Sequence, residues 1–474
     1  MASCPSLSRQ QPSIDADKLS YEIFSILESK FLFGYDNRNL FVPKPLPVAV
    51  TDRAPPPAVD GIPGGGIPVL ETEFPSLKGH LGQVCVLSID GGGGDGIASG
   101  VLAGKALAYL EDALQRLSGN PEARICEFFD VVAGSGIGGI LAAMLFATRD
   151  GKRPLYRAED AWKFLAEKSA GSARSTGGPR KFLSSLLGGS ARRSAPGMAE
   201  ERMVKEAFGG SMTLKETLKP VLIPCYDMCS AAPFLFSRAD ALESDSFDFR
   251  ISDVCHATSA EPGADKALEM QSVDGKTRVV GVEGSLAGMS NPTAAAITHV
   301  LHNKEEFPFV KSVEDLIVVS IGVGPGQPMT GTSEQEDAKN LKGRKWIRPI
   351  SRIAGDNSAE LVDQAVSMAF GQCSSTKYVR IQANSYVRAQ DKLSGKKEVV
   401  ANATKMAVMA DEMLKEKNVE SVLFGGKRVA EKTNGEKLDW FAGQIVEEHQ
   451  KRSRRAAPTV AIKRARSPKL PRSA

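Results

Sequence analysis

The stretch Ala133-Gly134-Ser135-Gly136-Ile137-Gly138-Gly139 decides the fold of this chain. The apolar residues at 128–132 predict a buried strand before it, and those at 139–146 predict a helix after it. A strand, a glycine-rich turn and a helix form the frame of a nucleophile elbow, in which Gly-x-Ser-x-Gly places a serine at the tip. Here Gly136 occupies the tip. The sequence therefore predicts the scaffold of a hydrolase without its attacking hydroxyl group.

A second glycine-rich turn, Asp-Gly-Gly-Gly-Gly-Asp-Gly-Ile at 90–97, follows another predicted strand at 84–89 and precedes a helical pattern. Backbone N–H groups in such a loop converge on one point, which suits a phosphate or a developing oxyanion. Gly91, Gly93 and Gly96 also fit the G-x-G-x-x-G fingerprint of a dinucleotide-binding fold. That alternative explains neither the aspartate that opens the loop nor the second elbow. A Walker A loop is excluded because no Gly-Lys-Ser/Thr follows.

A third segment, residues 279–293, predicts a short strand and a glycine-rich turn that carries Glu283. Together the three segments resemble the patatin-like phospholipase family. That family has an Asp-Gly-Gly-Gly-x-Arg-Gly loop, a Gly-x-Ser-x-Gly elbow and an Asp-Gly-Gly/Ala turn. Residues 257–260 (Ala-Thr-Ser-Ala) and the predicted strand at 316–322 also match it. The Gly-x-Gly-x-Gly elbow and the segment at 20–34 are similar to the plant type III patatin-related phospholipase A group.

The resemblance implies both a fold and an activity. The fold is a patatin-like three-layer α/β arrangement, with a mostly parallel central sheet flanked by helices. The activity is hydrolysis of ester bonds in membrane glycerolipids, both phospholipids and galactolipids, by a Ser-Asp dyad that needs no histidine, metal or cofactor. In that dyad the aspartate takes the proton, the serine attacks the ester carbonyl, and backbone N–H groups stabilise the oxyanion.

Three positions depart from the family pattern. Gly136 replaces the serine, Glu283 aligns with the dyad aspartate, and Asp95 stands where the loop normally has arginine. Loss of a serine nucleophile costs about a millionfold in turnover in a serine protease, yet about a thousandfold over water remains. Glu283 keeps a carboxylate that can activate water as a general base. We therefore expect a lipid acyl hydrolase with weak, non-covalent activity.

The predicted oxyanion donors are the backbone N–H groups of the glycine-rich loop and of the elbow. They belong to Gly91, Gly92, Gly93, Gly94 and Ile137. The alternative hypothesis is a catalytically dead pseudoenzyme that binds lipid or a protein partner. Ser135 is not expected to replace the nucleophile, because only the tip of an elbow presents its side chain to substrate. His299 and His302 share a predicted helix, but no acid or cysteine stands at ligand spacing, so no metal site is expected.

Length and composition favour one large α/β domain. The chain has 474 residues, of which 42% are apolar and 24% charged, enough to bury a full core. The predicted divisions are an N-terminal amphipathic helix segment (1–42), a Pro/Gly-rich linker (43–80), the patatin-like domain (81–445) with a basic insertion near 168–199, and a basic disordered tail (446–474).

Charge and cysteine usage predict location and partners. No apolar run approaches the roughly 20 residues that cross a bilayer, so any membrane contact is expected to be peripheral. Residues 168–199 contain six Lys/Arg and residues 451–474 contain nine, both without Asp or Glu, which suits either an anionic membrane surface or a solvated segment without a partner. The tail also has the form of a bipartite nuclear import signal, whereas no nucleic-acid partner is expected. Seven cysteines without disulfide-like spacing indicate the cytoplasm.

Overall fold

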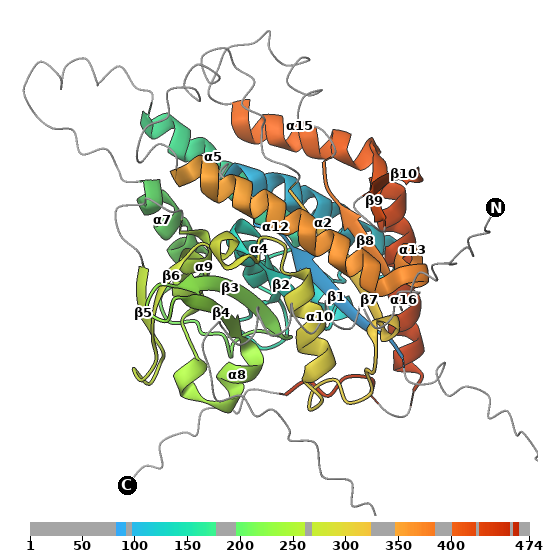
Figure 1. Ribbon diagram of the computed structural model, residues 1–474, viewed down its shortest axis with the longest axis horizontal. Coiled ribbons are helices and arrows are strands. Elements are labelled where there is room, and N and C mark those ends of the chain that lie inside the picture. The colour runs from blue at the N-terminus through green and yellow to red at the C-terminus, as the bar shows by residue number, and fades with distance from the viewer. Residues whose placement is uncertain are drawn as a thin grey trace, which may run out of the picture.

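The computed structural model describes eight stretches of the chain (Figure 1). They are residues 82–91, 97–176, 196–260, 268–323, 347–383, 401–422, 426–455 and 458–463. The predicted N-terminal helix segment (1–42) and linker (43–80) lie outside these residues, as does much of the basic insertion and the end of the tail. The expectations for those segments therefore stay predictions.

A mixed sheet forms the centre of the molecule. Within the described residues its strand order is β5-β6-β3-β2-β1-β7-β8, with β4 paired to β3. The five strands from β3 to β8 in this order pair in parallel, whereas β4 and β6 pair antiparallel to β3, and β5 antiparallel to β6. The strands are β1 (Val84–Ile89), β2 (Val131–Gly134), β3 (Val221–Asp227), β4 (Ala232–Ser237), β5 (Leu268–Gln271), β6 (Arg278–Val282), β7 (Leu316–Ile321), β8 (Tyr378–Ile381), and the separate antiparallel pair β9 (Lys417–Val422) and β10 (Gly426–Thr433).

Helices cover both faces of this sheet (Figure 1). One face carries α2, α4 and α16, with α5 and α15 against α2, and the other face carries α10 and α12. The helices are α2 (Ile97–Ser118), α3 (Ile125–Phe128), α4 (Gly136–Phe146), α5 (Ala158–Thr176), α7 (Pro196–Phe208), α8 (Arg238–Glu243), α9 (Ile251–Ser259), α10 (Thr293–His302), α12 (Ile347–Phe370), α13 (Ser374–Lys377), α15 (Ala401–Lys415) and α16 (Asn434–Ser453). None of these described helices has both the length and the apolar character needed to span a bilayer.

The central strand β1 shows why the three layers form. Its residues are all buried, because successive side chains point to opposite faces and both faces are covered. Leu87 and Ile89 belong to the core under α2 and α4, whereas Val84 and Val86 belong to the core under α10 and α12. The predicted α/β fold with a mostly parallel sheet flanked by helices is confirmed.

Two element boundaries near the elbow differ from the prediction. The strand expected at 128–132 begins only at Val131, because residues 125–128 form the short helix α3. The backbone N–H of Asp130 then donates to the carbonyl of Cys85 at 2.8 Å, which brings β2 alongside β1. The helix expected from Gly139 already begins at Gly136.

The boundary of the predicted disordered tail is also wrong. Helix α16 runs through residue 446 and ends at Ser453, and residues 458–463 lie against the folded core. The N–H of Ala461 donates to the carbonyl of Glu306 at 2.8 Å, and Val460 packs with the core under α10. Composition suggested disorder because the segment is basic, but specific acidic and carbonyl partners elsewhere in the chain hold its first part.

Candidate active site

The elbow has the backbone conformation that its sequence predicts. Gly136 has a φ of +51°, a left-handed value that side chains rarely adopt, and α4 begins there. A Cβ at Gly138 would lie 2.3 Å from the carbonyl oxygen of Ile89, so the turn packs backbone against backbone on the end of β1. The N–H of Gly136 donates to the hydroxyl of Thr258 at 3.0 Å. Thr258 comes from α9, the helix identified from its Ala-Thr-Ser-Ala motif.

The predicted oxyanion donors differ in their availability. Ile137 lies in the first turn of α4, where backbone N–H groups have no partner within the helix, so its N–H remains a candidate. The N–H of Gly91 instead donates to the carbonyl of Ser290 at 3.0 Å, so its prediction as an oxyanion donor is not supported. Gly92, Gly93 and Gly94 lie outside the described residues, as does Asp95.

The turn that carries Glu283 packs directly against the elbow. It follows β6, and the N–H of Glu283 donates to the carbonyl of Ala260 at 3.0 Å, at the end of α9. A Cβ at the next residue, Gly284, would lie 2.7 Å from the hydroxyl of Ser135, so only glycine fits between the two turns. The Glu283 side chain is 8% exposed, and the hydroxyl of Ser351 in α12 lies 3.4 Å from its Oε2 atom.

Two serines that flank these turns are buried. The Ser135 and Ser285 hydroxyls are shielded from solvent and form no hydrogen bond with the described part of the chain. Ser135 is 1% exposed and its hydroxyl lies against Gly284. This position agrees with the expectation that Ser135 does not act as a substitute nucleophile.

The sequence of this chain matches known proteins over nearly its whole length. The sequence model of the patatin-like phospholipase family matches residues 87–297. Patatin-like protein 6 of Arabidopsis thaliana is 53% identical over 459 residues, which cover 96% of this chain and 89% of that protein. Patatin-like protein 7 of the same plant is 52% identical, covering 96% of this chain and 86% of the relative.

The chain belongs to the patatin-like family. Family membership supports lipolytic acyl hydrolysis at the level of the family, and lipid substrates in general. The relatives are plant proteins, in agreement with the predicted plant group. One relative, the probable inactive patatin-like protein 9 of Arabidopsis thaliana, is 42% identical over 76% of this chain and 86% of its own length.

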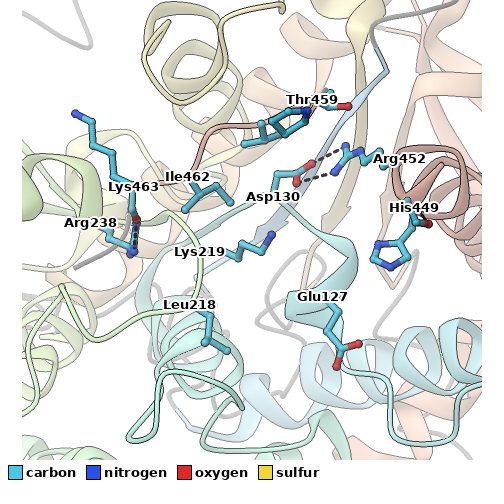
Figure 2. Close-up of a pocket in the computed structure, with 13 residues that line it drawn as sticks. Glu127, Asp130, Leu218, Lys219, Arg238, His449, Arg452, Thr459, Ile462 and Lys463 are labelled. Atoms are coloured by element: carbon cyan, nitrogen blue, oxygen red, sulfur yellow. Dashed lines mark hydrogen bonds and ion pairs between the residues drawn. The ribbon is translucent and has the colours of Figure 1, made fainter. Parts of the chain in front are cut away.

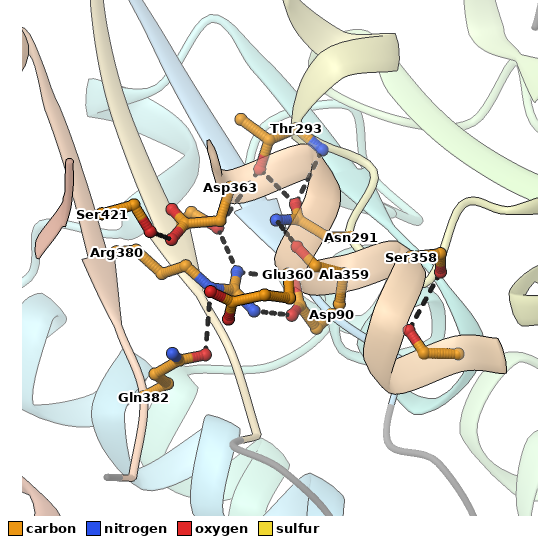
Figure 3. A network of polar contacts seen from close by, with 12 residues as sticks. Asp90, Asn291, Thr293, Ser358, Ala359, Glu360, Asp363, Arg380, Gln382 and Ser421 are labelled. Atoms are coloured by element: carbon orange, nitrogen blue, oxygen red, sulfur yellow. Dashed lines mark hydrogen bonds and ion pairs between the residues drawn. The ribbon is translucent and has the colours of Figure 1, made fainter. Parts of the chain in front are cut away.

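A buried ion pair supports the glycine-rich loop of this patatin-like protein (Figure 3). Arg380 in β8 and Asp90 at the end of β1 are 7% and 2% exposed, and both nitrogens of the guanidinium fork donate to the Asp90 carboxylate. Arg380 also donates to the hydroxyl of Ser320 at 2.9 Å and to the side chain of Gln382 at 3.0 Å. Burial alone would lower the pKa of Arg380, but the Asp90 carboxylate outweighs it and raises that pKa. Asp90 directly precedes the loop, so this pair fixes where the loop begins.

Sequence reasoning missed two of these side chains. Arg380 lies 290 positions from Asp90, and its only signal was a charged residue within the apolar strand pattern of β8. Ser351 lies 68 positions from Glu283 on a helix that no motif marks. Both belong to elements that only the folded chain brings to the site.

His299, one of the two histidines on α10, has an aromatic neighbour. His299 lies edge-on to the ring of Phe307, with 6.1 Å between the ring centres, and burial lowers the pKa of His299 to about 4. Within the described residues, no group of three or more His, Cys, Asp or Glu side chains lies close enough to hold a metal ion.

Proposed function

We propose that this chain is a weak lipid acyl hydrolase that cleaves phospholipid or galactolipid esters in membranes by direct attack of water. The observation that carries this proposal is the contact between the Glu283 turn and the elbow at Ser135. The contact brings a turn that bears a carboxylate to the elbow from which the family's serine attacks. Family membership supports lipid as the class of substrate.

The mechanism uses the glutamate in place of the whole dyad. A water molecule takes the position of the absent serine side chain above Gly136. Glu283 accepts one proton from this water, the water oxygen adds to the ester carbonyl, and the N–H of Ile137 stabilises the resulting oxyanion. When the tetrahedral intermediate collapses, Glu283 returns the proton to the departing alcohol. Fatty acid and lysolipid are the products.

Exposed apolar side chains on α12 support a lipid substrate. Ile350 and Ile353 of this helix are 56% and 57% exposed, one and two residues from Ser351, whose hydroxyl lies 3.4 Å from the Glu283 carboxylate. Large apolar side chains in water are unfavourable, and acyl chains or the membrane interface would cover them. The proposal retains a peripheral, cytoplasmic membrane location for the chain.

A second candidate function is lipid binding without hydrolysis. It is favoured by Gly136 at the tip of the elbow and by a relative whose name describes it as probably inactive. The two candidates share a lipid pocket and differ only in chemistry. Glu283-dependent fatty-acid release by the wild type separates them, whereas restoring the nucleophile tests the pocket that they share.

The test is Gly136→Ser, measured as fatty-acid release from phosphatidylcholine vesicles. A Cβ at Gly136 would lie 3.2 Å from the Cα of Gly91, a contact that a shift of a few tenths of an ångström relieves, and the φ of +51° strains any side chain placed there. If the pocket accepts lipid, we expect at least a tenfold gain over the wild-type rate, because a covalent route becomes available. Gly136→Ala is the matched control, since it adds the same Cβ without the hydroxyl. Equal rates for the two variants would contradict a substrate-competent pocket.

A further inference from the structure

A cavity of about 540 Å³ lies at the opposite end of the parallel strands from the candidate active site (Figure 2). Two of its lining residues, Asp130 and Lys219, come just before β2 and β3, whereas Gly136 comes just after β2. The two sites therefore lie at opposite ends of the strands, about one strand length apart. The patatin-like motifs do not involve this cavity.

The last described residues, 458–463, form one wall of this cavity. The N–H groups of Ala461 and Lys463 both donate to Glu306, at 2.8 Å to its carbonyl and 3.0 Å to its carboxylate. Arg238 at the start of α8 donates from Nη2 to the carbonyl of Lys463 at 2.7 Å. These bonds hold the segment in place, so the cavity is a feature of the folded chain.

Cations outnumber acids in the lining. Its charged members are Lys219, Arg238, Arg452 and Lys463 with His449, against Glu127 and Asp130. Asp130 is already satisfied, because its carboxylate accepts two bonds of 2.8 Å from Arg452 and one of 2.9 Å from the N–H of Cys85. Lys463 is paired with Glu243 and Glu305. Glu127 is exposed and turns its carboxylate away from Lys219 (Figure 2).

One cationic side chain of the lining therefore lacks a partner. Lys219 is half-buried, and its ammonium forms no hydrogen bond or ion pair with any residue in the described stretches. Arg238 is 3% exposed, and its Nη1 atom is shielded from solvent with a Glu306 carboxylate oxygen at 3.8 Å, so Arg238 adds positive charge but no accessible donor. Burial lowers the pKa of His449, and the nearby charges of Arg452 and Lys219 lower it further. The cavity is thus a positive environment with one unpaired ammonium, that of Lys219.

We propose that this cavity binds a phosphate-bearing anion, with Lys219 as its counter-ion. A lysine ammonium without a counter-ion in a positive, partly enclosed cavity attracts an anion, and a bound anion supplies the missing partner. Guanidinium and ammonium groups are the side chains that proteins use for phosphate. A doubly charged phosphate gains more here than a singly charged carboxylate does. The phosphate belongs either to a soluble ester or to a lipid headgroup.

The primary test measures the thermal unfolding of the full chain against inorganic phosphate, with sodium chloride and sodium acetate at matched ionic strength. Specific binding raises the midpoint temperature, because phosphate binds only the folded state. We expect Lys219→Ala to raise the dissociation constant for phosphate at least tenfold. Lys276→Ala, which removes a lysine that is 77% exposed on the β5–β6 turn, should leave it unchanged. An equal phosphate response in all three proteins would overturn the proposal, since phosphate also stabilises proteins by exclusion.

A second measurement covers the case in which Lys219→Ala does not fold, and it separates the two sources of phosphate. Lys219→Gln keeps the length of the stem, and co-sedimentation is measured with phosphatidic acid vesicles and phosphatidylcholine vesicles. Binding to phosphatidic acid that Lys219→Gln weakens at least tenfold assigns the site to a headgroup. A phosphate response without vesicle binding assigns it to a soluble ester. If Lys219→Gln changes neither readout, the proposal is wrong. Neither readout depends on hydrolysis at Glu283.

Discussion

The two ends of the central strands are built from different parts of the chain. At the carboxyl ends of β1 and β2, backbone packs on backbone: a Cβ at Gly138 would lie 2.3 Å from Ile89, and one at Gly91 would lie 3.0 Å from the Ser135 carbonyl. At the amino ends, side chains make the contacts. Asp130 holds Arg452 and the N–H of Cys85, and it comes directly before β2.

The two ends therefore tolerate substitutions differently. Backbone packing leaves no side chain that could move aside, so one added methyl group forces the strands apart. Contacts between side chains can be removed one at a time, and each removal lowers the free energy of unfolding by its own amount. At the elbow end we therefore expect a single substitution to cause a large loss of stability. At the amino end we expect each substitution to cause a separate, smaller loss.

The largest effect is expected for Gly138→Ala. Its Cβ would overlap the backbone of Ile89 and Asp90, so we expect a loss of about 3 kcal/mol or more in the free energy of unfolding. Urea denaturation followed by circular dichroism measures it. A variant as stable as the wild type would contradict the claim that backbone packing defines this end.

A somewhat smaller effect is expected for Arg452→Ala at the amino end. Removing this side chain leaves the Asp130 carboxylate, which is 2% exposed, without its cation, and breaking such a pair costs about 3 kcal/mol. Arg454→Ala is the matched control, because Arg454 is exposed at the same end of α16. The same denaturation experiment applies. Equal stability of the two variants would show that the pair does not hold this end together.

The third effect is a dependence of stability on pH, and it arises from His299 in α10. The pKa of His299 is lowered by burial to about 4, so below its ordinary value near 6.5 the unfolded chain binds a proton that the folded chain does not. Stability should fall by about 2 kcal/mol as the pH drops from 6.5 to 4. His299→Leu should lose this part of the dependence. An unchanged slope in the variant would assign the acid sensitivity to other groups.

The smallest effect is expected for Gly443→Ala in α16. No heavy atom lies within 4 Å of a Cβ at this position, so the substitution only restricts the unfolded chain. We expect a gain of about 0.5–1 kcal/mol in the free energy of unfolding. A loss instead would show that glycine positions in this chain are sensitive for a reason other than close backbone packing, which would weaken the interpretation of Gly138→Ala.

Sequence reasoning succeeded where the signal is local. The elbow around Gly136 and the turn at Glu283 are each specified within a few residues, and the structure places these two turns in contact. Prediction from the sequence failed where the interacting residue is distant along the chain. Arg380 reaches Asp90 across 290 positions, and Arg452 reaches Asp130 across 322, so neither partner is visible in its own segment.

The same limit explains the errors at the tail and at the loop. Basic composition predicted disorder from residue 446, but the acids that order α16 and residues 458–463 come from far earlier in the chain. The N–H of Gly91 was predicted to face the oxyanion, but it donates to the carbonyl of Ser290 instead. Which N–H groups of a loop stay free depends on neighbours that the loop sequence does not contain.

We propose that Glu283 performs the chemistry at an elbow whose tip, Gly136, carries no hydroxyl group. The most direct measurement is fatty-acid release from phosphatidylcholine and a galactolipid by the wild type and by Glu283→Gln, purified identically. Glutamine keeps the size of the side chain but cannot accept the proton from water. We predict slow release by the wild type and a loss of at least a hundredfold in the variant. Equal release by both proteins, or none by the wild type, would contradict the claim.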